Sequence, residues 1–405
     1  MSGNVLIAGG GIGGLAAALA CSRAGWSVRL LERAAAFSEV GAGIQTGPNV
    51  TRLLHAWGLG DALASVAVFP SHLQVRSAAS GRELGVLRLG DTALQRYGAP
   101  YATLHRADLH SLLLDAVRQQ TDVELTLDCG LTGFTQAPRR VSVQTRAEHG
   151  MEADLLLGAD GLWSAVRQCL LGDGPPRVTG HLAYRAMVLQ ASLPAHLRSQ
   201  HITVWLGRDL HVVQYPVRSG EWLNVVGIVH AGTHASAQLD GVQHGDAASD
   251  SAEWDQHTSA THLRAALVGA CAPLQGLVNA IDSWRRWVLC DRPSLRRADQ
   301  MARGRVALLG DAAHPMRPYL AQGAGMAIED AAELGRVLAD SPADASAALR
   351  AYADARWQRN ARVQARAIRN GRIFHARGLV RLGRDAALKV LGERVLDLPW
   401  LYRGQ

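Results

Sequence analysis

The 405-residue sequence contains a single lysine, Lys389, and aromatic residues make up 5% of it. Its apolar runs are shorter than the roughly 20 residues that span a bilayer, and the N-terminus lacks the basic, apolar and cleavage regions of a signal peptide. Cysteines are few and scattered, without a C-x-x-C pair, which predicts reduced thiols in a cytoplasmic protein. They are Cys21, Cys129, Cys169, Cys271 and Cys290.

The excess of positive charge, +7 at pH 7, does not indicate a nucleic-acid partner, because the arginines are spread along the chain rather than clustered. A basic surface that attracts small anionic molecules is the preferred interpretation. The hydrophobic fraction of 48% and the charged fraction of 19% are typical of a globular protein. A chain of this length is expected to form one large domain or two intimate domains.

The first thirty-three residues carry the strongest signal. A short apolar strand, Val5–Ala8, leads into Gly9–Gly14, and an alanine- and leucine-rich helix follows to about residue 24. Gly9, Gly11 and Gly14, with Gly13 beside them, fit G-x-G-x-x-G between a strand and a helix, where glycines let a pyrophosphate approach the helix start. A second strand at 28–31 ends in Glu32, about 18 residues after Gly14 and near the spacing of an acid that binds a ribose hydroxyl. This unit predicts a dinucleotide site.

Two further strands deliver an aspartate to a turn before a helix. Residues 153–157 lead into Asp160-Gly161, and residues 305–309 lead into Gly310-Asp311. Ligands collect at the carboxyl edge of a parallel sheet, although Asp160 also fits a helix cap. A loop follows Asp311, and a helix opens at Gly323-Ala324. The polyol part of a cofactor suits Asp311, and the helix start suits an electron-rich ring.

Other stretches are open to two interpretations. The glycine-rich loop 40–49, which contains Gln45, is either ordered against a cofactor, the preferred interpretation, or simply flexible. Arg106, near a predicted helix start, either neutralises a phosphate or is an ordinary surface arginine. In the strand 210–217, the period of two places His211, Val213 and Tyr215 on one face. This face suits phenol chemistry or a satisfied, half-buried sheet surface.

The histidine-rich tract around residues 231–262 does not predict a metal site. Its histidines lack a regular ligand spacing, and the tract is expected to be an exposed loop. These histidines are His230, His234, His244, His257 and His262.

The predicted fold class is α/β, with a Rossmann-like dinucleotide-binding domain, an inserted mixed or antiparallel β-sheet substrate domain and C-terminal helices. The dinucleotide-binding domain is expected over residues 1–67, 101–177 and 291–340. The substrate domain is expected over 68–100 and 178–290, and the helical region over 341–405. The last helices are expected to pack on the domain or on a second subunit, which makes a homodimer one expected assembly.

These motifs together resemble the single-component FAD-dependent aromatic hydroxylases of the para-hydroxybenzoate hydroxylase superfamily. The resemblance rests on Gly9–Gly14, on Asp160-Gly161 and on Gly310-Asp311 with Pro315. Further segments resemble the branch with 3-hydroxybenzoate 6-hydroxylase, salicylate hydroxylase and 6-hydroxynicotinate 3-monooxygenase. They are residues 41–49, 105–110, 284–292 and 310–331.

The resemblance implies roles for particular residues. Glu32 and the neighbouring Arg33 would lie at the adenosine ribose, and Arg106 at the pyrophosphate. Asp311 would bind the ribityl chain, and the Gly323-Ala324 backbone the flavin N1/C2 edge. Gln45 would lie near the isoalloxazine, and Asp160 would contribute to binding both FAD and the transient NADH or NADPH. His211 and Tyr215 would contact the substrate, with His211 as the base.

The implied reaction is hydroxylation of a small phenolic acid with NAD(P)H and O₂ through a flavin C4a-hydroperoxide. Two departures concern the substrate: Pro318 stands where the 3-hydroxybenzoate enzymes tend to have glutamine, and Gln45 and Tyr319 stand where the hydroxynicotinate enzymes carry histidine. The alternatives are a flavin hydroxylase of a larger ring, such as a quinolone or polyketide intermediate, an NAD-dependent dehydrogenase, and a non-catalytic flavin-binding protein.

Overall fold

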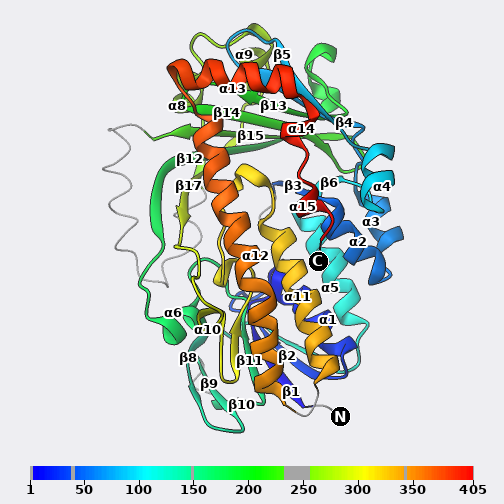
Figure 1. Ribbon diagram of the computed structural model, residues 1–405, viewed down its shortest axis with the longest axis vertical. Coiled ribbons are helices and arrows are strands. Elements are labelled where there is room, and N and C mark those ends of the chain that lie inside the picture. Colours follow the sequence, from blue (N-terminus) through cyan, green and yellow to red (C-terminus); the bar gives the residue numbers. More distant parts are fainter. Residues whose placement is uncertain (1–2, 38–41, 147–149, 232–255, 342–343, 405) are drawn as a thin grey trace. The chain divides into compact units, whose positions relative to one another are not determined.

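The computed structural model describes residues 3–37, 42–146, 150–231, 256–341 and 344–404. Contacts divide the chain into two compact units. The first comprises residues 1–40, 107–176 and 291–367, and the second comprises residues 41–106, 177–290 and 368–405. Element labels follow Figure 1.

The first unit contains a six-stranded sheet in the order β18-β19-β11-β1-β2-β7. Five neighbouring strands run parallel, and β18 pairs antiparallel with β19. The strands β1 and β11 are buried along most of their length because both sheet faces are covered. The bounds are β1 (Asn4–Ala8), β2 (Ser27–Leu31), β7 (Val123–Thr126), β11 (Leu155–Gly158), β18 (Ala302–Arg303) and β19 (Val306–Leu308).

Helices with small residues pack closely on this sheet. In α1 (Ile12–Arg23), alanine and glycine leave room for α11 (Gly323–Asp340), and a Cβ built on Gly335 would lie 3.0 Å from the Ala20 Cβ. Figure 1 shows α11 beside the long helix α12 (Ala345–Phe374). The remaining elements are α5 (Arg106–Arg118), β8 (Leu131–Gln136), β9 (Val141–Thr145), β10 (Gly150–Ala153), α6 (Ala165–Leu171), α10 (Ala298–Met301), η4 (Gly310–Ala312) and η5 (Pro318–Leu320).

The second unit contains an eight-stranded sheet in the order β16-β17-β12-β15-β14-β13-β4-β5. The sheet is mixed, because β13 runs parallel to β4 while β12, β15, β14 and β13 pair antiparallel. One face is packed with apolar side chains, including Leu210, Val212 and Val225, against those of α8 and α9. The strands are β4 (His72–Ser77), β5 (Glu83–Arg88), β12 (Arg177–Leu189), β13 (Ile202–Leu206), β14 (Leu210–Val217), β15 (Trp222–His230), β16 (Gln256–Thr258) and β17 (Trp284–Asp291).

A two-stranded ribbon of β3 (Gly43–Thr46) and β6 (Ala102–His105) also belongs to this unit. The other elements are α2 (Pro48–Ala56), α3 (Gly60–Val66), α4 (Asp91–Tyr97), η1 (Gln190–Ser192), η2 (Ala195–Leu197), α8 (Thr261–Ala266), α9 (Ala272–Asn279), α13 (Gly378–Leu391), α14 (Glu393–Leu396) and α15 (Pro399–Tyr402).

The predicted α/β class, with a Rossmann-like sheet, a mixed or antiparallel second sheet and C-terminal helices, is confirmed. The unit boundaries differ from the expected domains, because residues 42–67 and 101–106 associate with the second sheet. Thr103 Oγ1 donates to the Pro216 carbonyl oxygen at 2.6 Å, and the Gly43 N–H donates to Asn224 Oδ1 at 2.7 Å. The division into a cofactor domain and a substrate domain stays a prediction. In the part of the chain that the structure describes, no helix is long and apolar enough to cross a membrane.

Candidate active site

The three sequence motifs meet at one edge of the first unit's sheet. β1, β11 and β19 are consecutive parallel neighbours, so the turns that follow them emerge at the same carboxyl edge. These turns hold Gly9–Gly14, Asp160-Gly161 and Gly310-Asp311. Segments about 150 residues apart in the chain are thereby adjacent in space, at the edge where ligands of parallel α/β sheets bind.

The glycine turn needs glycine for close approach. Gly9 has a φ of +105°, and a Cβ built on it would lie 2.5 Å from the Ala159 carbonyl oxygen. A Cβ on Gly14 would lie 1.9 Å from the Gly9 oxygen. Helix α1 therefore begins directly on the turn, with Gly11 as its N-cap and no side-chain cap, and its first backbone N–H groups suit an anion. Gly13 lies beside Ala327 and Leu309, at the junction of α1, α11 and β19.

Glu32 closes the turn from the next strand. One carboxylate oxygen accepts from the Gly10 N–H at 2.7 Å, and the other accepts from the Ala34 N–H at 2.9 Å. His110, from α5, donates its Nε2–H to the Gly10 carbonyl oxygen at 2.8 Å. Arg33 is exposed, and its Cβ lies near Gly130. Glu32 is thus positioned beside the glycine turn, whereas Arg33 has no such placement.

Asp160 supports the start of α6, whose N-cap residue is Ser164. Its carboxylate accepts from the Ser164 hydroxyl at 2.5 Å and from the Val166 N–H at 3.1 Å, at the start of α6. Burial raises the pKa of Asp160, while these hydrogen bonds oppose the rise. The side chain therefore fixes the turn, and Gly161, with a φ of +77°, presents backbone at the sheet edge.

Asp311 is exposed in the short helix η4, beside the N-terminus of α11. A Cβ built on Gly323 would lie 3.9 Å from Asp311 Oδ1, so the carboxylate and the helix start share one small region. Gly323 and Ala324 are half-buried in the first turn of an 18-residue helix. Pro315 is buried, and its carbonyl oxygen accepts from Gln364 Nε2 at 3.0 Å.

A buried ionic cluster supports the Gly310-Asp311 turn. Asp330 accepts from the Gly310 N–H, from His314 Nε2, from Asn360 Nδ2 and from Arg356 Nε. Arg356, at 1% exposure, also pairs with Glu329 at 2.8 Å. Sequence reasoning missed this cluster, because the arginine-rich helix gave no sign that one arginine is buried. On the other side of the turn, Arg167 donates to the carbonyl oxygens of Ala312 and Ala313.

In the second unit, one sheet face carries the predicted substrate residues. His211 pairs with Ile228, Val213 with Val226 and Tyr215 with Asn224, which places the three strand-β14 residues on the face opposite the Leu210 and Val212 core. This geometry agrees with the expected alternation. Four residues apart, the His211 and Tyr215 Cα atoms are separated by about 13 Å at ~3.3 Å per residue.

His211 is 1% exposed, and its Nδ1 lies 2.8 Å from Nε2 of His375. Burial, and the neighbouring His375 and His181, lower the pKa of His211 well below its ordinary value. The imidazole is therefore neutral at neutral pH, which is the form that accepts a proton. Sequence reasoning missed His375, which lies 164 residues away in the chain.

Tyr215 lies against the ribbon strand β3. A Cβ on Gly43 would lie 2.6 Å from its ring, and burial raises its pKa, which a hydrogen bond with Gln45 opposes. Gln45 Oε1 also accepts from the Tyr101 hydroxyl at 2.8 Å. Arg185 shares the sheet face through its pairing with Val226, and its guanidinium lies 4.9 Å from the Trp287 ring centroid. A cation beside an aromatic ring was not predicted, although the alternation of strand 181–191 places Arg185 there.

Arg106 is the first residue of α5 and the last residue of this stretch that belongs to the second unit. Its N–H donates to the Ala42 carbonyl oxygen at 3.0 Å. The two interpretations of Arg106, a phosphate ligand or an ordinary surface arginine, both stay predictions. His234 and His244 of the histidine-rich tract lie outside the described residues, and within those residues no cluster of histidine, cysteine and acidic side chains fits a metal ion.

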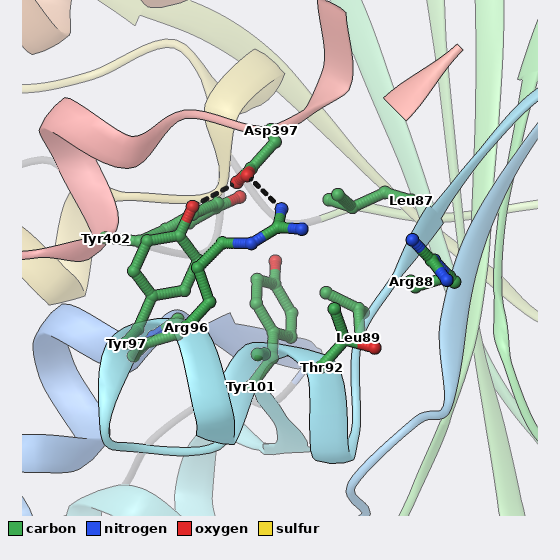
Figure 2. A pocket seen from close by; sticks show the side chains of 11 residues that line it. Leu87, Arg88, Leu89, Thr92, Arg96, Tyr97, Tyr101, Asp397 and Tyr402 are labelled. Atoms are coloured by element: carbon green, nitrogen blue, oxygen red, sulfur yellow. Dashed lines mark hydrogen bonds and ion pairs between the residues drawn. The ribbon is translucent and has the colours of Figure 1, made fainter. Parts of the chain in front are cut away.

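Two cavities lie elsewhere. One, of about 340 Å³, is at the amino ends of β1 and β2, opposite the edge that carries the motifs. The other is a small cavity in the second unit, shown in Figure 2, where Arg96 and Tyr97 point toward Asp397 and where Tyr101 and Tyr402 also line the space.

A family model described as an FAD binding domain matches residues 3–367. The chain belongs to this FAD-binding family. A 3-hydroxybenzoate 6-hydroxylase from Polaromonas naphthalenivorans (strain CJ2) is 38% identical over 400 residues, covering 98% of this chain and 95% of that protein. A 6-hydroxynicotinate 3-monooxygenase from Bordetella bronchiseptica (strain ATCC BAA-588 / NCTC 13252 / RB50) is 36% identical and covers 89% of each.

Among solved structures, a salicylate hydroxylase substrate complex superposes with a TM-score of 0.80 at 25% identity, covering 99% of this chain and 95% of that one. Within the family, the chain therefore belongs to the branch of flavoprotein aromatic hydroxylases, and FAD is its cofactor. This bears out the predicted family and cofactor. Membership of this flavoprotein family also excludes the alternative of a simple NAD-dependent dehydrogenase.

The residues present fit FAD. One sheet edge carries three suitable features. They are the Gly9–Gly14 turn, which has no room for a Cβ, the Glu32 carboxylate after β2, and the exposed Asp311 carboxylate beside a helix N-terminus. These are donors and acceptors for a pyrophosphate, a ribose and a polyol.

Proposed function

We propose that this flavoprotein hydroxylates a small phenolic acid of the hydroxybenzoate type, with O₂ and with NADH or NADPH as the reductant. The named activities of the full-length relatives on 3-hydroxybenzoate and 6-hydroxynicotinate support this substrate class. The observation that carries the proposal from this chain is a buried, neutral histidine on the sheet face it shares with Tyr215, in a protein whose three FAD motifs share one sheet edge.

We assign the FAD contacts as follows. Glu32 would bind the adenosine ribose, the Gly9–Gly14 turn the pyrophosphate, and Asp311 the ribityl chain. The Gly323-Ala324 backbone would face the flavin N1/C2 edge, where a helix N-terminus favours negative charge. When bound, FAD supplies the redox and oxygen-activating chemistry of the reaction. The roles predicted for Arg33, Gln45, Arg106, Asp160, Gly310 and Pro315 rest on the resemblance.

His211 is the proposed base. Removing the phenol proton makes the ring carbons more electron-rich, and a neutral imidazole performs this step near neutral pH. Nδ1 faces His375, so Nε2 is the nitrogen assigned to the substrate. Tyr215 would position the ring from the same face, and Arg185 supplies a positive charge there for a substrate carboxylate.

The decisive experiment is a screen of NADH and NADPH oxidation by the FAD-loaded enzyme with hydroxybenzoates, hydroxypyridines and bicyclic phenols. Product identity and H₂O₂ are measured together, because a phenol can stimulate oxidation without being hydroxylated. We expect a hydroxylated product from a single-ring phenolic acid and little H₂O₂. Coupled turnover only with bicyclic phenols would favour the larger-ring alternative, and H₂O₂ without product from every compound would contradict the substrate class.

The location and assembly are also proposals. Five free cysteines, none of them disulfide-bonded, agree with a reducing compartment such as the cytoplasm. A homodimer is proposed on the strength of exposed apolar residues along α13, among them Leu379, Leu382 and Val390. Sedimentation of the purified protein checks the subunit number.

A further inference from the structure

Four histidines of the second unit lie together in space. They come from β12, β14, the end of β15 and the residue after α12, and they are His181, His211, His230 and His375. His211 Nδ1 lies 2.8 Å from His375 Nε2. The ring centroids of His375 and His181 are 5.2 Å apart, and those of His181 and His230 are 5.4 Å apart.

The order of the four rings follows their exposure. His211 is buried, His375 and His181 are half-buried, and His230 is exposed. The cluster therefore runs from the inside of the unit to its surface. The strand register explains part of the cluster, because His181 of β12 is the direct cross-strand partner of His230, the last residue of β15. A histidine with a purely structural role needs only one hydrogen-bonding neighbour. Here each histidine ring has the next one beside it, from His211 to His230.

We propose that His375, with His181 and His230 behind it, is the path by which the proton taken up by His211 leaves for solvent. This inference rests on the proposed function, in which His211 is the base. It assigns His375 and His181 a role in proton transfer that requires contact with His211 or with each other rather than with the substrate.

Each step balances. The phenol O–H bond breaks as an N–H bond forms at Nε2 of His211, and the proton on its Nδ1 passes to Nε2 of His375. His375 then loses the proton on its own Nδ1 toward His181, directly or through one bridging water. Nδ1 of His181 lies 3.0 Å from the Thr179 carbonyl oxygen, to which it donates, so its Nε2 is the accepting atom. His181 then releases the proton from Nε2 to solvent beside the exposed His230, which returns His181 to its neutral form. No oxidant or reductant takes part.

Burial and the neighbouring charges keep His375 in its neutral form at rest. Burial, with the nearby His181, His230 and Arg384, lowers the pKa of His375 to about 3, and Asp209 opposes this fall. Asp209 also pairs with Arg377 at 2.5 Å and lies 3.6 Å from Arg208. Arg384 pairs with Asp385 and donates to the Phe374 carbonyl oxygen. A neutral relay passes a proton on without holding it.

The competing explanation is packing alone. The His211 ring lies 5.3 Å from Phe374 in an edge-on contact, and His375 fills the space beside it. A packing role predicts that glutamine, which is similar in size and can form hydrogen bonds, would replace His375 without kinetic effect. A relay role predicts a kinetic effect, because an amide side chain does not exchange protons in this way.

The test is a pH jump on the FAD-loaded enzyme with bound 3-hydroxybenzoate, and with 6-hydroxynicotinate as a second probe. Stopped-flow absorbance of the phenolate reports proton loss directly, without turnover. We expect His375→Gln to slow phenolate formation roughly tenfold or more, and added imidazole to restore the rate in proportion to its concentration. His196→Gln, at an exposed position in the same unit, is the matched control and should behave as wild type.

The outcomes separate the two proposals. Slowing in His211→Gln, with wild-type kinetics and no imidazole effect in His375→Gln, overturns the relay and leaves the proposed function intact. Wild-type phenolate formation in His211→Gln removes the base itself, and the relay with it. If His375→Gln loses FAD or its cooperative unfolding, His181→Gln takes its place, and a wild-type rate in that variant overturns the relay.

Discussion

The backbone N–H of Gly310 donates to Oδ2 of Asp330 across 3.1 Å, in a fully buried position. The turn that presents Asp311 is therefore held by a carboxylate twenty residues further along the chain. The same carboxylate pairs with Arg356 at 2.8 Å. The structure thus couples the proposed ribityl site to a buried ionic cluster through the backbone of Gly310.

Asp330→Asn should weaken both folding and FAD binding. The substitution keeps the shape of the side chain but leaves Arg356 with less compensating charge, and breaking a buried ion pair typically destabilises by roughly 3–5 kcal/mol. Urea denaturation and FAD titration measure the two effects. Asp340→Asn, an exposed partner of Arg336 on the same helix, should change stability by less than about 1 kcal/mol. Equal behaviour of the two variants would contradict the account.

Acid should also release this cluster. Burial alone would raise the pKa of Asp330, but the charges of His314 and Arg356 outweigh it and hold the pKa well below its usual range. The unfolded chain binds the proton first, at about pH 3.9, so the stabilisation is complete above that pH and decreases as the pH falls below it. Wild-type protein should lose more stability between pH 5 and pH 3 (roughly the window of an unfolded aspartate) than Asp330→Asn does. Parallel curves would contradict this.

Asp311→Ala should lose FAD while the protein stays folded, because the exposed carboxylate contributes to ligand contacts rather than to the core. Retention of the yellow cofactor through gel filtration is the measurement, with the apo-protein's unfolding midpoint as the check on folding. Asp282→Ala, exposed in the second unit, serves as the control. Stoichiometric FAD in Asp311→Ala would refute the ribityl assignment.

The acid limb of activity should reflect the environment of His211. A base works in its neutral form, and burial and neighbouring histidines lower its pKa well below the ordinary value of about 6.5. The rate of hydroxylation under saturating NAD(P)H should therefore persist below pH 6.5 and fall only at more acidic pH. His211→Ala should reduce the rate by roughly 10² to 10⁴-fold while FAD stays bound. An acid limb centred on the ordinary histidine pKa would contradict the buried, neutral state.

The C-terminal segment should depend on Asp397. Its carboxylate accepts from Arg96 at 2.5 Å and from the Tyr97 hydroxyl at 2.6 Å, beside the cavity in Figure 2. Asp397→Asn should destabilise by about 1–3 kcal/mol, as expected for hydrogen bonds to a charged group, and trypsin should then cut faster at Arg394. Glu393→Gln, whose ion pairs are more exposed, should have a smaller effect. Unchanged cleavage in Asp397→Asn would show that this contact does not hold the segment.

Local signals made much of the fold predictable. The strand, glycine turn and helix of residues 4–23 follow from neighbouring residues alone, and so does the alternation that places His211 and Tyr215 on one face. The helix α4 at Asp91–Tyr97 was not predicted, because residues 68–100 were assigned as a whole to the β-sheet substrate domain. The expectation for Asp160 was open; its carboxylate accepts from the Val166 N–H in the first turn of α6, while Ser164 is the N-cap, so its cofactor role stays a prediction.

Contacts between charged or titratable residues far apart in the chain could not be predicted from the sequence, for a physical reason. Arg356 and Asp330, or His211 and His375, interact only after folding places distant segments together, and a single sequence offers no periodicity that links them. An arginine-rich helix predicts a solvated surface, whereas here one arginine is buried because two acidic side chains compensate its charge. The candidate site was therefore predictable at its strand ends and not in the clusters that support it.

The proposed function depends on the transfer of one oxygen atom from O₂ to the substrate ring, and isotopic labelling measures this transfer. The FAD-loaded enzyme is supplied with NAD(P)H and ¹⁸O₂, and the product from the phenolic acid that gave coupled turnover is analysed by mass spectrometry. The account predicts one ¹⁸O atom in a new hydroxyl group of the ring. Recovery of unreacted substrate, or of an oxidised product that contains no ¹⁸O, would contradict this reaction.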